Sequence, residues 1–467
     1  MTRGTLRSRE AGRLQLRKLL RSLTAPGDLA RSAATRAKAR LCLLDTIGNM
    51  VAASGLPEAA AVRRAEGPLP EGAATVVGWS QPTSPLRAAF HNGVHSDLLE
   101  AQDGHRYAGL HPCEATIPAA LAVAETTGAR YGELIDAIVA GYETTVRFGE
   151  TLFPEQTQNG FYPDGTCGPP GGAVAASRLL GSDLDTTEAA VSAALFMAPL
   201  SLIQNLRDAV KPLSAGSAAE LALRAAFWAR EGLGAGPGSL LEPNGFLQQL
   251  SAHPHLGRLR RPVDGSWAID EVYFKPYPGG RHAHAPVDAV REILGDRPTD
   301  PRTIEEVEVA TYRAAIALTG SAPTRSSPLA ELTQSTRYAI AAGICDGTTG
   351  PERFELRRRH DPALLALSRR IRLVEDPAAT RRYPEETLAT VTLRFRRGRA
   401  ERAIVRHRWG DPERPMSVEE VRAKFLRSLG GRSGAEAVWE SWWSAPKDAD
   451  VRDLLAPLPR TLARAAR

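Results

Sequence analysis

The chain has 467 residues, of which 43% are hydrophobic and 24% are charged, and these are the proportions of an ordinary globular protein. It contains no run of about 18 apolar residues, which argues against a membrane span. The formal net charge is +6, and the first twenty-one residues alone carry seven basic residues and one acidic residue; the rest is therefore nearly neutral, which argues against nucleic-acid binding.

The basic N-terminal segment, residues 1–21, lacks the apolar stretch of a secretory signal. We expect it to be a frayed terminus, with an organelle-targeting segment as the alternative. The four cysteines, Cys42, Cys113, Cys167 and Cys345, lie far apart and lack the spacing of zinc or iron–sulfur ligands. We therefore expect a cytoplasmic protein without a bound metal ion.

The first part of the chain, residues 1–262, has the pattern of a helical domain. Apolar residues from Leu29 to Ile47 fall on one face of a helix that we expect to end near Gly55. A second helical run near residues 134–139 leads to Glu143 and Arg147, whose spacing indicates a structural ion pair. Alanine-rich helices are predicted near 171–180, 187–204 and 216–232, which is typical of a compact bundle.

The pattern changes after residue 262. A β-prone run spans residues 304–309, and residues 390–395 alternate before a turn at Arg397-Gly398 and a returning run at 403–405, which predicts a hairpin. Helices are predicted near 285–295 and 327–343. Residues 263–407 therefore read as a smaller α+β domain. Ser417 and Glu420 form a capping box for a helix through Phe425, and residues 408–467 are expected to be helical.

The segment 91–120 concentrates groups that can transfer protons. Glycines and a proline break it up, so it is not one regular helix, and an apolar helical run follows it. Proton donors and acceptors on a bent segment braced by a buried helix suit acid–base chemistry. The groups are His91, His95, His105, His111, Asp97, Glu100 and Asp103. We expect His91 and His95 to be packed or surface residues.

Other residues stand out less. Lys211 and Lys275 are two of only six lysines and both precede proline; a compact ammonium fits a tight pocket and can give up a proton, unlike a guanidinium. His282 and His284 could bind a metal, but no third ligand is evident. The tryptophans at 439, 442 and 443 are expected to be packing or dimer contacts.

Eight segments, taken in order, resemble motifs of one family. They are Leu44–Gly48, Ala89–Gly93, His111-Pro112, Pro118–Ala122, Gly141–Glu143, Gly160–Thr166, Lys211–Ala219 and Lys275–Asp288. The chain is thereby similar to the MmgE/PrpD family, which includes 2-methylcitrate dehydratase, cis-aconitate decarboxylase and iminodisuccinate epimerase. The resemblance implies a mainly α fold, in which a large helical domain, made from the N-terminal part and the C-terminal tail, carries an inserted smaller α+β domain. It also implies a homodimer with no metal or organic cofactor.

The resemblance also assigns candidate site residues. The expected catalytic residues are His111, Tyr162, Lys211, Lys275 and Asp103; the expected substrate-binding residues are Glu100, His105, Asn92 and Arg281. Tyr162 and Ser214 stand where the family motifs have histidines, Asp97 replaces another histidine, and Glu100 replaces an aspartate. These departures argue against methylcitrate itself as the substrate.

The chemistry we expect is elimination of water from a small carboxylic acid. The two lysines would bind a carboxylate and stabilise the enolate-like state, and Arg281 would add a bidentate contact. His111 is the leading general acid or base, Tyr162 a second proton relay, and Asp103 a group that orients a histidine.

The leading hypothesis is a hydro-lyase acting on a hydroxylated di- or tricarboxylate or a related β-hydroxy acid, with a biosynthetic substrate left open. Decarboxylation of an unsaturated tricarboxylate and epimerisation next to a carboxylate are alternatives with the same proton chemistry. A catalytically inactive binding protein is the alternative from another class. We expect a small-molecule carboxylate as the partner, and neither nucleic acid nor membrane.

Overall fold

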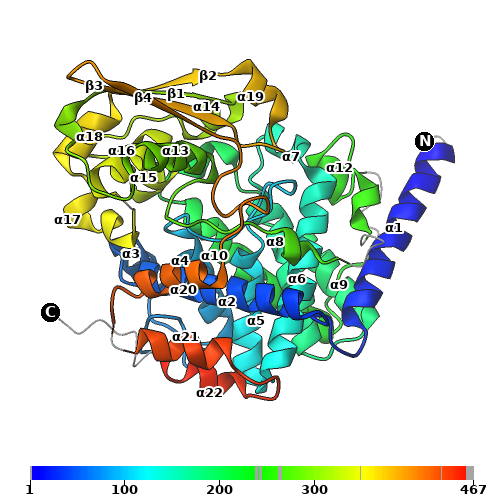
Figure 1. Ribbon diagram of the computed structural model, residues 1–467. Helices are drawn as coiled ribbons and strands as arrows, with labels where there is room; N and C mark the ends of the chain where they lie inside the picture. The colour runs from blue at the N-terminus through cyan, green and yellow to red at the C-terminus, as the bar shows by residue number, and fades with distance from the viewer. Residues whose placement is uncertain are drawn as a thin grey trace.

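Most of the chain is α-helical, and its sheet lies at one end of the molecule (Figure 1). This computed structural model describes residues 3–236, 240, 244–260, 266–347, 349–432 and 434–458. The prediction of a mainly α fold with a smaller α+β part is confirmed. Within the described residues, no helix is both long enough and apolar enough to cross a membrane.

The N-terminal segment is not frayed, contrary to our expectation. It forms helix α1 (Arg3–Thr24), which lies along the side of the helical body (Figure 1). Leu16, Leu19, Leu20 and Leu23 are buried, and their spacing puts them on one helix face. The interpretation gave weight to the basic residues and overlooked this apolar stripe.

Helix α2 (Ala33–Ser54) is the first long helix of the helical body. The Ser32 hydroxyl accepts a hydrogen bond from the Thr35 amide at 2.9 Å and caps its start, and the helix ends at Gly55 as predicted. The other elements of this body are α3 (Pro57–Glu66), α4 (Pro85–Asp97), α5 (Cys113–Thr127), α6 (Tyr131–Leu152), α7 (Glu155–Gln158), α8 (Pro163–Leu179), α9 (Leu184–Phe196), α10 (Lys211–Arg230), α12 (Phe246–Leu250) and the short 3₁₀ turns η1 (Ile203–Arg207), η2 (Leu256–Leu259) and η3 (Ala268–Glu271).

All three alanine-rich helices differ from their predicted bounds, and α10, predicted near 216–232, runs from Lys211 to Arg230. Helix α8 begins at Pro163, earlier than expected, with the proline at the first helical position, where its missing amide hydrogen costs nothing. Helix α9 ends at Phe196 rather than near residue 204, because Pro199 follows and a proline disfavours helical geometry in the residue before it. The chain from Met197 to Val210 is therefore free to form part of a pocket wall.

The sheet has four strands in the order β2-β1-β3-β4. They are β1 (Ile304–Thr311), β2 (Ile371–Glu375), β3 (Ala389–Phe395) and β4 (Ala400–Val405). Strand β1 runs parallel to β2 and antiparallel to β3, and β3 pairs antiparallel with β4. The predicted hairpin is confirmed, with Gly398 in its turn at φ 81°. Strand β2 was not predicted.

Helices cover one face of this sheet (Figure 1). Helix α13 (His284–Leu294) packs on β3 and β4. The helix predicted over 327–343 is two helices, α15 (Leu329–Gln334) and α16 (Thr336–Asp346), because the Ser335 hydroxyl caps a new start. The remaining elements are α14 (Arg313–Thr319), α17 (Leu356–Arg359), α18 (Pro362–Ser368), α19 (Pro377–Arg382) and the 3₁₀ turns η4 (Arg281–Ala283), η5 (Pro301–Thr303) and η6 (Pro351–Phe354).

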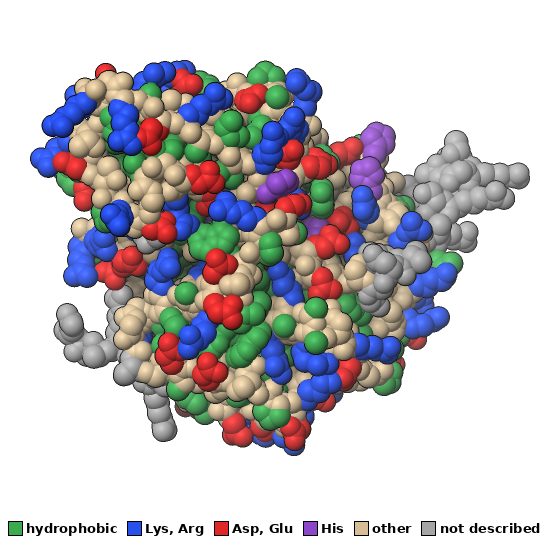
Figure 2. All heavy atoms as spheres, in the orientation of Figure 1, with side chains coloured by type: hydrophobic (Ala, Val, Ile, Leu, Met, Phe, Trp, Pro, Cys, Tyr) green, Lys and Arg blue, Asp and Glu red, His purple; other side chains and the backbone are tan. Residues whose placement is uncertain are grey.

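The C-terminal helices α20 (Val418–Ser428), α21 (Ala435–Trp443) and α22 (Val451–Leu455) pack on the helical body. The capping box that starts α20 is confirmed, with hydrogen bonds of 2.7 and 3.2 Å between Ser417 and Glu420. Lys424 forms an ion pair with Asp45 of α2 at 2.6 Å. Trp439 and Trp442 are buried, which confirms a packing role for them. Figure 2 shows acidic and basic side chains interspersed over the visible face.

Candidate active site

Close contact between α4 and α10 brings two distant motifs together. A Cβ atom at Gly93 would lie 2.8 Å from the Ala215 carbonyl oxygen, and one at Gly216 would lie 2.8 Å from the Phe90 carbonyl oxygen. Only glycine allows the two backbones to approach this closely. The end of α4 therefore meets the start of α10, where Lys211 lies.

Glu100 is held by both lysines that the sequence singled out. Its two carboxylate oxygens pair with different ammonium groups: one with Lys211, and the other with Lys275 at 2.9 Å. Lys211 also pairs with Asp97. Burial alone would raise the pKa of Glu100, but the two lysines outweigh it and hold the pKa well below its usual value. Glu100 also has φ of 51°, in the left-handed region, so the fold holds it in a costly conformation.

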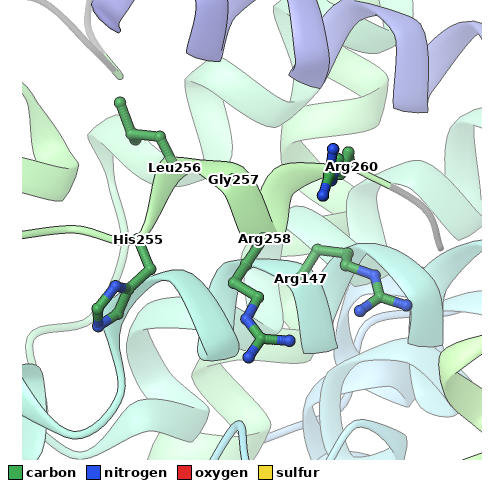
Figure 3. A pocket seen from close by; sticks show the side chains of 6 residues that line it. All are labelled: Arg147, His255, Leu256, Gly257, Arg258 and Arg260. Carbon is green, nitrogen blue, oxygen red and sulfur yellow. The ribbon is translucent and has the colours of Figure 1, made fainter.

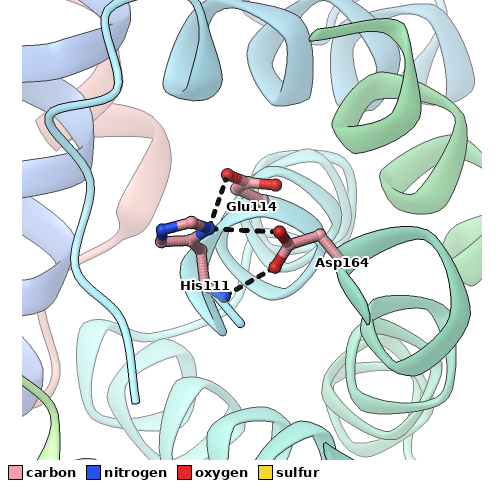
Figure 4. A group of neighbouring side chains, drawn as sticks. All are labelled: His111, Glu114 and Asp164. Atoms are coloured by element: carbon pink, nitrogen blue, oxygen red, sulfur yellow. Dashed lines mark hydrogen bonds and ion pairs between the residues drawn. The ribbon is translucent and has the colours of Figure 1, made fainter. Parts of the chain in front are cut away.

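His111 lies between two carboxyl groups (Figure 4). Its Nδ1 is 3.1 Å from Asp164 Oδ2 and 3.5 Å from Glu114 Oε1, and its amide donates to Asp164 Oδ1 at 2.6 Å. Burial would raise the pKa of Asp164, but the contacts with His111 hold it below its usual value. Burial and the neighbouring carboxylates raise the pKa of Glu114 well above its usual value. At neutral pH Asp164 is therefore ionised, whereas burial favours the protonated form of Glu114.

Gln102 connects the two clusters. Its side-chain amide donates to Asp97 Oδ1 at 2.9 Å and to Glu114 Oε1 at 2.6 Å. The lysine–carboxylate cluster and the His111 cluster are thus parts of one buried polar network.

A cavity of about 120 Å³ opens onto this network where the helical body meets the part that contains the sheet. Its wall includes Glu100, His105, His111, Tyr162 and Arg281 from the predicted site. Residues from the second part of the chain complete the wall, namely Tyr273, His282, Leu318, Gln334 and Tyr383.

One end of the cavity carries a positive charge. The Nη2 atoms of Arg281 and Arg408 lie 3.5 and 3.0 Å from the same oxygen of Asp411. The single carboxylate of Asp411 thus pairs with two guanidinium groups, so these three side chains together carry about one net positive charge. Since Arg281 lines the cavity, this end is suited to an acidic ligand.

Tyr162 separates this cavity from a neighbouring hollow. The Lys211 ammonium is 5.6 Å from the centre of its ring. Burial and the nearby carboxylates of Asp164 and Glu114 raise the pKa of Tyr162 well above its usual value. Its phenol therefore keeps its proton at neutral pH.

The other predicted residues lie at different depths around the cavity. His105 is buried in its wall, with Nε2 3.6 Å from Glu271. Lys275 is fully buried, does not line the cavity, and reaches it only through Glu100. His91 and His95 pack against Trp79, as expected.

Asp103 and Asn92 do not occupy their predicted places. Asp103 accepts a hydrogen bond from the Tyr142 hydroxyl at 2.6 Å and does not line the cavity; the carboxylate that contacts the His111 ring is that of Asp164. The Asn92 side chain bonds to the backbone at Val77 (2.8 Å) and Thr75 (3.0 Å), so its amide supports a loop and does not face the cavity.

Sequence reasoning missed Asp164 and Glu114. Glu114 follows His111 by three residues, a spacing that could have drawn attention to it. Asp164 lies within the Gly160–Thr166 motif but 53 residues from His111, so only the fold reveals their contact. Together with His111 they offer ligand atoms within 4.8 Å of one another, the one group in the described part of the chain that could hold a metal ion. The His282–His284 pair does not form such a group there.

A separate hollow of about 470 Å³ lies beside η2 and contains none of the predicted site residues (Figure 3). Basic side chains line it, among them Arg147, His255, Arg258 and Arg260. Arg147 is paired with Glu143 at 2.8 Å, which confirms the predicted ion pair, and with Glu150 at 2.7 Å. Predicted site residues thus line the cavity around His111, and none of them lines this hollow.

The arrangement of the two parts agrees with comparisons between this chain and known proteins. Residues 28–258 match the MmgE/PrpD N-terminal domain, and residues 277–441 match the MmgE/PrpD C-terminal domain. The chain belongs to the MmgE/PrpD family. The cavity lies where these two matched parts meet.

Several members of the family are similar to this chain at low identity. A cis-aconitate decarboxylase from Aspergillus terreus is 28% identical over 49% of this chain and 49% of its own length. A 2-methylcitrate dehydratase from Cupriavidus necator is 27% identical over 45% of this chain and 46% of its own length. An alkylcitrate dehydratase from a fungal species is 26% identical over 55% of this chain and 53% of its own length. The chain thus spans about half the length of the curated relatives it matches.

Proposed function

We propose that this protein is a lyase that removes water from a hydroxylated di- or tricarboxylate, and that its own side chains carry the proton transfers. The observation that supports the proposal is the pairing of His111 with Asp164 at a cavity that the cationic side chain of Arg281 also lines. Elimination requires a base for the proton next to a carboxylate, a cation for that carboxylate, and an acid for the departing hydroxyl.

His111 acts as the base. Ionised Asp164 favours the tautomer that donates Nδ1–H to it, and in this neutral tautomer the lone pair lies on Nε2, which points away from both carboxyl groups (Figure 4). An imidazole in this tautomer can remove the proton from the carbon next to the substrate carboxylate. As the proton leaves, Asp164 stabilises the imidazolium that forms.

Arg281 binds the carboxylate on which negative charge develops. Its guanidinium lies in the cavity wall and shares Asp411 with Arg408, so its charge is only partly neutralised. A donor placed at a developing anion is worth roughly 3–4 kcal/mol of barrier height.

Tyr162 supplies the proton to the departing hydroxyl. Its raised pKa keeps the phenol protonated, and it lies in the same wall as His111. Lys211 and Lys275 fix Glu100 in the wall; direct contact of Lys211 with substrate requires its ammonium to leave Asp97 or Glu100.

Decarboxylation is the second candidate, because the similar proteins include cis-aconitate decarboxylases. The same cationic end would stabilise the carbanion left when carbon dioxide departs, and an acid in the wall would protonate it.

The proposal is tested by incubating the protein with each acid of a panel. The panel contains citrate, 2-methylcitrate, cis-aconitate, tartrate and longer β-hydroxy acids. New alkene absorbance identifies dehydration, released carbon dioxide identifies decarboxylation, and uptake of deuterium from solvent reports proton removal alone. We expect dehydration of at least one acid and its loss in His111→Asn. Absence of all three signals across the panel would instead support a binding protein.

A further inference from the structure

His282 is a side chain of the cavity wall to which the proposed function gives no role. It lies in the turn η4 directly after Arg281, is half-buried, and lines the same cavity as His111. Its Nδ1 is 2.7 Å from the Tyr312 hydroxyl, whereas Nε2 has no hydrogen-bond partner among the described residues. Nε2 is therefore the ring nitrogen that can contact a ligand in the cavity.

The ring of His282 is uncharged at neutral pH. Burial and the guanidinium groups of Arg281 and Arg408 lower its pKa to about 3. An uncharged imidazole carries one hydrogen, on either Nδ1 or Nε2, and the bond made by one nitrogen decides the state of the other. What His282 offers to a ligand therefore depends on its contact with Tyr312.

Tyr312 fixes the position of the ring hydrogen. It is 1% exposed, and burial raises the pKa of its phenol, so the hydroxyl keeps its proton at neutral pH. Within the described part of the chain, this hydroxyl has one hydrogen-bond partner, Nδ1 of His282. Because a buried hydroxyl without an acceptor is costly, Tyr312 donates to Nδ1, and the ring hydrogen lies on Nε2.

Aromatic packing holds the two side chains in place. The ring of Tyr312 stacks on that of Tyr383, with ring centres 4.5 Å apart and an angle of 15° between the ring planes. The ring of His282 meets Tyr312 edge-on, with centres 5.6 Å apart. Tyr383 also lines the cavity, so the three rings support one another in and behind its wall. The Nε2–H group is thus oriented before a ligand arrives.

We propose that His282 donates a hydrogen bond from Nε2 to the substrate carboxylate that Arg281 binds, and that Tyr312 is a positioning residue that holds this tautomer. The two donors follow one another in η4, so one turn presents both to the cavity. The inference rests on the proposed function, because the bond strengthens as negative charge develops on that carboxylate. An uncharged donor stabilises this charge without exchanging a proton with the substrate.

The experiment compares kcat and KM of His282→Phe and His282→Gln on the best acid of the panel. Loss of the donor in His282→Phe should lower kcat by about 10²–10³-fold and change KM less, because the bond is strongest in the transition state. The side-chain amide in His282→Gln can place an N–H group near the position of Nε2, so kcat should stay within about tenfold of the wild-type value.

Tyr312→Phe tests the positioning role. It should lower kcat severalfold at unchanged KM, because the ring hydrogen of His282 can then move to Nδ1. In the His282→Gln background the same change should have no effect, since an amide has no tautomer to fix. Tyr338→Phe is the matched control, because the buried Tyr338 hydroxyl donates to the Arg359 carbonyl oxygen at 2.8 Å and does not line the cavity. It should leave kcat unchanged.

Equal kcat in His282→Phe and the wild type would overturn the inference and leave the proposed function standing. If His282→Gln is as inactive as His282→Phe, the ring itself transfers a proton, which contradicts a role as donor alone. Turnover of no panel acid by the wild type would overturn both proposals. If circular dichroism shows that His282→Phe does not fold, unchanged kcat in Tyr312→Phe overturns the inference.

Discussion

Two halves of the same histidine-rich segment have opposite roles in the structure. In α4, His91 and His95 are fully buried, with ring centres 4.8 and 5.0 Å from that of Trp79. Burial lowers the pKa of His91 to about 4 and that of His95 to about 3, so both rings are neutral. Both rings therefore act as neutral aromatic groups that pack against Trp79 in the protein interior.

The half that follows α4 holds His111, whose side chain is 13% exposed and lines the cavity. The carboxyl groups of Asp164 and Glu114 flank it. A histidine next to a carboxylate and open to a cavity can thus take part in proton transfer, whereas one packed on an indole is only structural. Density of histidines along the chain does not distinguish the two.

The strongest test of this comparison is His111→Asn. We expect kcat to fall by about 10²–10⁴-fold, the usual contribution of a general acid or base. Steady-state kinetics on the best acid of the panel measures it. His95→Leu is the matched change in the structural half and should leave kcat unchanged; an equal loss in both variants would contradict the comparison.

Lys211 joins the two halves, because it pairs with Asp97 at the end of α4 and with Glu100 after it. Lys211→Met leaves two buried carboxylates without this partner, so we expect the free energy of unfolding to fall by about 3–5 kcal/mol, together with loss of turnover. Urea unfolding measures the first effect. Lys447→Met is the control: that lysine is 50% exposed and pairs with Asp28, so its removal should cost less than about 1 kcal/mol.

Arg281→Lys sharpens the assignment of the cationic end. The variant keeps the charge but loses the planar pair of donors, so kcat/KM should fall roughly 10- to 100-fold, mainly through kcat, as a hydrogen bond to a charged group is worth about 1.5–3 kcal/mol and this one strengthens as the negative charge develops. Arg302→Lys, at an arginine 87% exposed, should change neither constant. Unaltered kinetics in Arg281→Lys would remove this residue from the site.

The pH dependence of stability tests the structural half. His91 and His95 have lower pKa values folded than unfolded, so their contribution is complete above pH 6.5 and is lost as the pH falls toward about 4. Each ring should add about 1.4 kcal/mol of lost stability per pH unit in that window. The variant with His91→Leu and His95→Leu should show a shallower decline; parallel curves for the variant and the wild type would show that the rings do not remain neutral.

The sequence predicted the parts of the site that belong to recognisable motifs. His111, Tyr162 and Arg281 line one cavity although up to 170 positions separate them. Asp164 was missed and Asp103 was given its role, because proximity along the chain favours Asp103 while the turn into α8 brings Asp164 to His111.

The predictions of the fold were wrong at two kinds of place. One is a helix whose sequence is rich in basic residues although one of its faces is buried, and the other is a helix that is ended by a proline or by a capping hydrogen bond. Helix α1 was not predicted, because the interpretation rested on the basic residues of this segment and not on the spacing of its four leucines, which are buried. Helices near 187–204 and 327–343 were drawn too long because Pro199 and the Ser335 cap act through local geometry that hydrophobic spacing does not reveal.

The bond between Lys424 and the loop after α4 has a consequence for biosynthesis. Besides pairing with Asp45, Lys424 donates to the Ala101 carbonyl oxygen at 2.6 Å, across 323 positions of the chain. A ribosome that has made residues 1–423 has not yet made this residue, so in the nascent protein the loop after α4, which holds Glu100, lacks this anchor. Chains that terminate before residue 424 should therefore be inactive even though His111, Asp164 and Arg281 are all present.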